Sequence, residues 1–203
     1  MAYPSVSAPY GLIPINLIGG QVFAGATRQI PIATNSSTSI FFGDVVKLGS
    51  GGTLLKDVGT DAATPVGVFL GCTYTDPTFG KTFRQYYAAT TNITDIVAYV
   101  QDDPDALFRV AVVSTGSTIS YVNRSAVGEN AVLIQTAGST TTGNSKVSVS
   151  STTATTSTFP IRIIDVVPET QSATGSYTEV IVKWNAPSSG TTGGHQYAQP
   201  TGI

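Results

Sequence analysis

The chain of 203 residues is long enough for one large all-β domain or two small ones with a real hydrophobic core. Charged residues make up 11% of it, well under the roughly 25% usual for soluble domains, so uncharged polar residues must cover most of the surface. A net charge of −2 supplies no basic field, and we therefore expect neither nucleic acid nor a membrane as a partner. Because little charge keeps molecules apart, this composition favours assembly with other proteins.

Residues 1–29 are predicted to form an extended N-terminal arm. The first charged residue is Arg28, and three prolines and four glycines interrupt the uncharged run before it. Those prolines would break the hydrogen bonds of a membrane-spanning helix, and the run lacks the basic start of a signal peptide. We therefore expect an arm that packs on something else and becomes ordered on assembly, with a short extended segment at 12–18.

Residues 30–184 are predicted to form one β-rich domain, because β-branched residues dominate and helical periodicity is almost absent. Short apolar runs alternate with turn residues, with the spacing of a β-barrel or β-sandwich. The runs lie at 30–33, 40–48, 53–55, 66–73, 93–100 and 107–113. The one plausible helix is a turn or two at 82–89, a segment that equally suits an aromatic-rich strand.

Two glycine-containing segments invite a comparison with phosphate-binding loops. Gly49-Ser50-Gly51-Gly52 lies between two apolar runs, lacks GxGxxG spacing and is followed by no helix. We interpret it as the bend of a β-hairpin. FGKT at 79–82 resembles the end of a Walker loop, but Thr75 stands where that pattern needs glycine. Neither segment predicts nucleotide binding.

Serine and threonine fill fifteen of the twenty-three positions at 136–158. Such a bias suits a linker, but 146–150 alternates with period two, so we favour partly ordered edge strands and loops. FPIRIIDVV at 159–167 and YTEVIVKW at 177–184 predict an antiparallel pair with Val180, Val182 and Trp184 on one face.

Residues 185–203 are rich in glycine, serine and proline and are predicted to form a flexible C-terminal tail, since they bury too little to order themselves.

Residues that usually carry chemistry are scarce. Cys72, the only cysteine, is interpreted as a small buried hydrophobe, and His195, the only histidine, lies in a tail that cannot hold a catalytic base. One residue of each kind leaves no ordinary zinc site. Asp102, Asp103 and Asp105 are interpreted as a solvated turn rather than a calcium site. We therefore predict no catalytic, cofactor-binding or metal-binding residues, no cofactor, and no enzymatic activity.

Four aromatic residues gather in a short segment, at Phe79, Phe83, Tyr86 and Tyr87. They suit a sugar-stacking platform, but we favour core or interface anchors.

Several stretches resemble structural proteins of bacterial viruses. GDVVKL at 43–48, the acidic Asp57 and TPVGVFLGCTYTD at 64–76 look like an arrangement in small β-barrel head-decoration proteins of phages. The opening APYGLIPINLIGGQVFAGATRQIPI and the closing PIRIIDVVPET…YTEVIVKWN resemble virion structural proteins of cyanophages and related viruses. The motifs are structural, so no catalytic or ligating residue is carried over.

The resemblance implies a capsid cement (decoration) protein on the outer surface of a virion. Such a protein binds the major capsid protein at joints between subunits, stabilises the head, and is itself a homo-oligomer, often a trimer. The alternative is a host- or carbohydrate-binding module on the virion exterior, built on the aromatic segment, or another minor virion structural protein. A carboxylate hydrolase and the major shell subunit are disfavoured, because neither a paired-acid signature nor a long helix is visible.

Overall fold

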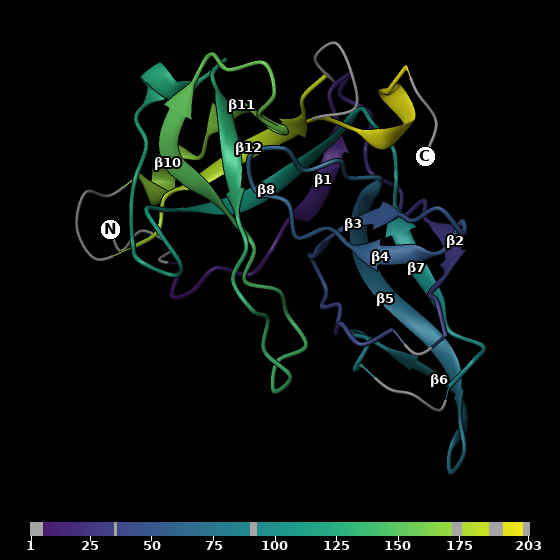
Figure 1. The fold of residues 1–203 in the computed structure, drawn as a ribbon. Coiled ribbons are helices and arrows are strands. Elements are labelled where there is room, and N and C mark those ends of the chain that lie inside the picture. Colours follow the sequence, from purple (N-terminus) through teal and green to yellow (C-terminus); the bar gives the residue numbers. More distant parts are fainter. Residues whose placement is uncertain (1–5, 35, 90–92, 172–175, 187–192, 201–203) are drawn as a thin grey trace.

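The computed structural model describes residues 6–34, 36–89, 93–171, 176–186 and 193–200. There the chain forms twelve β-strands and three short 3-10 helices, and the strands make two six-stranded sheets that lie side by side (Figure 1). The predicted all-β fold is confirmed. Among these residues no helix is long and apolar enough to cross a bilayer.

The first sheet closes into a barrel. Its strands, in spatial order, are β1 (Ile13–Leu17), β8 (Ala106–Val113), β10 (Ser148–Ala154), β9 (Asn130–Ile134), β11 (Ile161–Val166) and β12 (Glu179–Trp184). Because β12 also pairs with β8, five strands form a ring, and β1 extends it along the start of β8. Inward-facing apolar side chains fill the ring, where Phe108 and Trp184 lie with ring centroids 5.0 Å apart.

The pairing of β11 with β12 was predicted correctly from the sequence, but the position of β10 was not. β11 and β12 are antiparallel, and Val180, Val182 and Trp184 are buried on one face, as expected. The Ser/Thr-rich segment 136–158 was expected to supply edge strands. Instead β10 lies between β9 and β8, with Val149 in the core, because its alternating small and apolar residues suit the inside of a barrel.

The second sheet has the order β2 (Arg28–Pro31), β7 (Val97–Gln101), β5 (Gly67–Asp76), β3 (Val45–Leu48) and β4 (Leu54–Lys56), and β6 (Gly80–Arg84) pairs with β5. A parallel bridge between Ile32 and Leu54 brings the two ends of this order together. Its core contains Phe69, Val100 and Tyr87. The segment 82–89 is therefore strand and loop rather than helix.

The glycine-rich segment at 49–52 is the bend of the β3–β4 hairpin, as predicted. Leu48 pairs with Leu54 across it, and Gly52 takes a φ of +69°, which a side chain would strain. No helix follows, so its backbone amides do not converge on a phosphate site.

The predicted arm is largely built into the domain. Leu12 is fully buried in the barrel core, β1 pairs with β8, and β2 is a strand of the second sheet. Before β1, Val6 and Tyr10 pack on the outside of the barrel against Tyr177. The uncharged stretch before Arg28 can pack on the barrel because no charge has to be desolvated, and Arg28 at the start of β2 keeps an exposed side chain.

The predicted flexible tail differs from its structure at 193–200. His195 is 1% exposed, and the Gln196 side chain forms two hydrogen bonds with the backbone of Leu48, of 2.9 and 3.1 Å. The backbone N–H of Gln196 also donates to the Pro65 carbonyl at 2.7 Å. Only a few residues of the tail make these contacts, so the overall Gly/Ser/Pro composition of the tail did not predict them.

Three 3-10 helices complete the fold: η1 (Arg124–Ala126), η2 (Pro168–Thr170) and η3 (Gln196–Ala198) in the tail.

Candidate binding surface

The residues that were candidates for chemistry in the sequence have structural roles in the fold. Cys72 is fully buried, and this burial raises the pKa of its thiol to about 12, so it stays protonated at neutral pH. FGKT at 79–82 lies in the turn and first half of β6, an extended segment without the helix that a phosphate loop requires.

The three turn aspartates do not converge. Asp102 pairs with Arg28 at 2.5 Å and Asp105 with Lys183 at 2.6 Å, while the Asp103 carboxylate accepts the Asp105 N–H at 2.8 Å. No cluster of three or more metal-ligating side chains occurs in the part of the chain that the structure describes. The turn carries the chain from β7 in the second sheet to β8 in the barrel.

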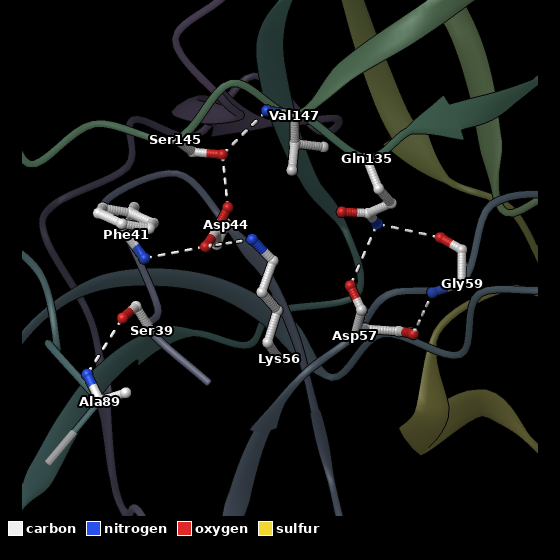
Figure 2. Close-up of polar contacts among 10 residues, drawn as sticks. All are labelled: Ser39, Phe41, Asp44, Lys56, Asp57, Gly59, Ala89, Gln135, Ser145 and Val147. Atoms are coloured by element: carbon white, nitrogen blue, oxygen red, sulfur yellow. Dashed lines mark hydrogen bonds and ion pairs between the residues drawn. The ribbon is translucent and has the colours of Figure 1, made fainter. Parts of the chain in front are cut away.

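Two buried aspartates that had no role assigned from the sequence lie where the two sheets meet (Figure 2). Asp44 is fully buried and accepts hydrogen bonds from the Phe41 N–H at 2.9 Å, the Lys56 ammonium at 2.8 Å and the Ser145 hydroxyl at 2.5 Å. Ser145 precedes β10 of the barrel, so this carboxylate joins a barrel loop to the second sheet. All its partners are supplied by the fold, which makes Asp44 a structural residue.

Asp57 forms the second buried site in the same region. Its carboxylate accepts the backbone N–H groups of Gly59 and Thr64 at 3.0 and 2.8 Å, and Lys47 lies 3.7 Å away. Gln135, which follows β9, donates to the Asp57 and Gly59 carbonyls (Figure 2). Asp57 therefore shapes the 57–64 loop and does not offer a free carboxylate.

His195 is a buried residue of the docked tail. It lies between Trp184 and Tyr197, with ring centroids at 6.5 and 5.3 Å, and its Nδ1 accepts the Tyr197 N–H. Burial lowers the pKa of its imidazole, although Asp102 and Asp103 oppose that shift. The neutral form is therefore the one that fits the folded chain.

This burial predicts a pH dependence of stability. The unfolded chain takes up a proton near pH 6.5, its ordinary pKa, whereas the folded chain resists it, so stability is complete above that pH and falls as pH drops through it. We expect the urea midpoint to fall between about pH 7.5 and about pH 5.5, a window in which carboxylates of ordinary pKa hardly titrate. Because the chain has one histidine, His195→Gln should flatten the profile. An equal slope in both proteins would contradict the assignment.

The end of the β5–β6 hairpin, residues 74–84, is called the finger below. β7 pairs with β5 only as far as Thr73, while β6 pairs with β5 out to Asp76, so the hairpin projects beyond the sheet (Figure 1). Phe79 is 79% exposed and Phe83 60% exposed. Side chains this apolar and this exposed are typical of anchors for a partner.

Hydrogen bonds within the hairpin, and to Asp95 just before β7, fix the shape of the finger. The Asp76 carboxylate accepts the N–H groups of Thr78 and Phe79 at 2.8 and 3.2 Å. The Asp95 carboxylate accepts the Thr75 hydroxyl at 2.5 Å and its N–H at 3.1 Å. Phe79 is thus presented on a preorganised turn, which lowers the entropic cost of docking.

The four aromatic residues do not form one platform. Tyr87 is 2% exposed in the core, and Tyr86 stacks on Phe41 with centroids 5.5 Å apart. Phe79 and Phe83 alone face solvent on the finger. Tyr87 is therefore a core residue, and the interpretation of Phe79 and Phe83 as interface anchors stays a prediction.

A groove lies between the arm and the turn after β7, with a volume of about 460 Å³, and is called the arm groove below. It is lined by the apolar Leu17, Val22 and Phe23 and by the charged Arg28, Asp102 and Asp103, of which Arg28 and Asp102 form an ion pair. Val22 is 80% exposed on the arm. The groove and the finger are two surfaces of the described residues on which large exposed apolar side chains combine with a defined shape.

No family model matches the sequence, and neither a curated protein nor a solved structure is detectably similar to the chain. The resemblance to phage decoration proteins therefore remains a prediction.

Proposed function

We propose that the chain is a capsid cement protein of a tailed bacteriophage, which binds the major capsid protein at joints between subunits on the outside of the head. The observation that carries this proposal is the placement of exposed apolar side chains at two separated ends of a well-packed molecule. Ile18 and Val22 lie on the arm, and Phe79 and Phe83 lie on the finger. A molecule with an adhesive surface at each end can span a joint.

Cementing requires binding and no chemistry. A protein that binds only the assembled shell stabilises it by mass action, and two surfaces on one rigid domain bind with an effective concentration that raises the avidity. The low charge of the chain suits this role, because little desolvation opposes docking of its surfaces.

Electron microscopy of virus particles tests the proposal directly. An antibody against the purified chain should label the outer surface of phage heads isolated from the natural source, and an averaged map should show its density over joints between shell subunits. Labelling of tails alone, or of no particle, would overturn the proposal.

Binding to heads that lack the protein tests the arm. Deleting 1–27 would also remove Leu12 and β1 from the barrel, so point variants are cleaner. We expect Ile18→Ser combined with Val22→Ser to lower occupancy at least about tenfold, which corresponds to about 1.4 kcal/mol. Val58→Ser is the matched control, because Val58 is 64% exposed outside both surfaces. Equal occupancy of the arm variant and the control would exclude the arm from the contact.

The alternative, a carbohydrate-binding module, is tested with the same finger. Tyr87→Ala would damage the core, so the informative variant is Phe79→Ala with Phe83→Ala. Specific binding to a glycan array that this variant loses would favour the alternative over cementing.

A further inference from the structure

We propose that residues 193–200 form a pH-sensitive latch, which ties the second sheet to the barrel at neutral pH and detaches in mild acid while both sheets stay folded. His195 is the residue that switches it. The inference concerns the chain by itself and does not depend on binding to a shell.

The latch contacts both sheets. On the barrel side, Gly193 lies so close to the Thr158 carbonyl that no side chain would fit between them, and the His195 ring packs beside β12. On the other side, the Gln196 side chain forms its two hydrogen bonds with the backbone of Leu48, at the end of β3. A segment of a few residues therefore connects the end of β12 to β3.

The closed latch requires a neutral imidazole. His195 is the N-cap residue of η3, and its Nδ1 accepts the Tyr197 N–H at 3.3 Å, so this nitrogen must carry a lone pair. The proton of the neutral ring is therefore on Nε2. A second proton, on Nδ1, would point one N–H group at another and remove the cap of η3.

Burial sets the protonation state of His195 against the charges around it. The residue is 1% exposed, and this burial lowers the pKa of its imidazole. Asp102 and Asp103, which follow β7, and two backbone carbonyls favour the charged ring, but they do not cancel the effect of burial. Trp184, on the β12 side, is uncharged and adds nothing that would stabilise an imidazolium.

Two further groups lie on the side of the aspartates. Arg28 of β2 pairs with Asp102, so part of that negative charge is already balanced before His195 takes up a proton. The Arg28 guanidinium also lies 5.4 Å from the centroid of the Tyr197 ring. Burial raises the pKa of the Tyr197 phenol, which therefore stays neutral and does not titrate in mild acid.

Acid therefore opens the latch. In a detached latch His195 takes up a proton with its ordinary pKa of about 6.5, whereas the docked ring takes one up only at lower pH. Docking is thus complete above about pH 6.5 and weakens below it, by up to about tenfold per pH unit. Opening breaks the contacts of a few side chains and leaves both hydrophobic cores in place, so it precedes unfolding of the sheets.

Amide hydrogen exchange of the full chain, followed by NMR, tests the proposal. The Gln196 N–H donates to the Pro65 carbonyl at 2.7 Å and reports on the latch, while the hydrogen-bonded Leu12 N–H reports on the barrel. We expect the protection factor of the Gln196 N–H to fall by up to about tenfold between about pH 7.5 and about pH 5.5. The protection factor of the Leu12 N–H should change much less.

Three variants separate a switch from a merely structural contact. His195→Asn keeps a side-chain acceptor for the Tyr197 N–H and has no titratable group, so its Gln196 protection should not depend on pH. His195→Ala lacks the cap and should lower this protection at least about twofold already at about pH 7.5. Asp103→Asn removes a charge that favours the imidazolium, so it should enlarge the loss at about pH 5.5.

Several outcomes would overturn the proposal. They are a Gln196 protection factor that is constant in the wild type, that falls equally in His195→Asn, or that falls only together with that of Leu12. Unchanged protection in His195→Ala, or a smaller loss in Asp103→Asn, would do the same. No viral shell takes part in these measurements, so failure here is distinct from failure of the shell-binding proposal.

Discussion

Replacing Asp44 with alanine is expected to lower the free energy of unfolding by about 3–5 kcal/mol, the usual cost of removing one partner of a buried ion pair. The Asp44 carboxylate is fully buried and accepts hydrogen bonds from Phe41, Lys56 and Ser145. Its loss leaves the Lys56 ammonium, whose side chain is only 10% exposed, without its counter-ion. Urea unfolding at neutral pH measures the effect.

The size of this loss of unfolding free energy distinguishes the buried Asp44–Lys56 pair from an ordinary surface ion pair. Asp105→Ala is the matched control, because Asp105 pairs with Lys183 at 2.6 Å but is 61% exposed, and such pairs contribute about 0–1 kcal/mol. Asp44→Asn should lie between the two, since the amide keeps an acceptor for the Phe41 N–H but loses the charge that balances Lys56. Equal losses in Asp44→Ala and Asp105→Ala would contradict the role assigned to Asp44.

Local sequence patterns predicted many of the strands and two of their nearest pairings, but they gave no strand at β9 (Asn130–Ile134). The apolar runs around 45–48 and 54–56, with glycines between them, specify a hairpin because register and turn chemistry are both local. The same holds for β11 and β12. Local patterns could not predict that the barrel closes. Closure depends on an antiparallel pairing of β8 with β12 and a parallel pairing of β8 with β10.

Residues whose environment is set by distant segments could not be placed from local patterns. Glu179 alternates with Val180 and so belongs to the outer face of β12, yet it is 2% exposed because the N-terminal arm covers it. His195 lies in a Gly/Ser/Pro-rich tail, and only its contacts with Trp184 and Tyr197 reveal that it is buried. Whether a polar residue is buried depends on which distant segments pack against it, and this cannot be predicted from composition.

Asp44 did leave a signal in the sequence. It is a lone charge between Phe41-Phe42 and Val45-Val46, where a solvated residue is out of place. A buried carboxylate must be paired, and that requirement predicts a cation or several N–H donors nearby. The identity of the donors, Lys56 and Ser145, still required the tertiary fold.

The contact between the arm and the barrel predicts the second large effect. Glu179 accepts hydrogen bonds from the Tyr10 hydroxyl and the Arg109 guanidinium, and burial together with this carboxylate raises the pKa of Tyr10, which therefore remains a donor. Glu179→Ala removes both contacts. Because the Arg109 side chain is 42% exposed and can turn to water, we expect a loss of about 2–3 kcal/mol, below the full cost of a stranded buried charge.

The Glu179 carboxylate also holds the arm on the barrel, so its removal should loosen the arm as well as lower the free energy of unfolding. Limited proteolysis of Glu179→Ala should cut the chain faster within 6–10, whereas the Leu12 N–H, bonded to the Gly43 carbonyl at 2.9 Å, should stay protected from hydrogen exchange. A double-mutant cycle of Tyr10→Phe and Glu179→Gln should give a coupling energy of about 0.5–3 kcal/mol, as expected for two groups in direct contact. Zero coupling, or unchanged proteolysis within 6–10, would mean that Val6 and the other apolar contacts of the arm hold it in place without Glu179.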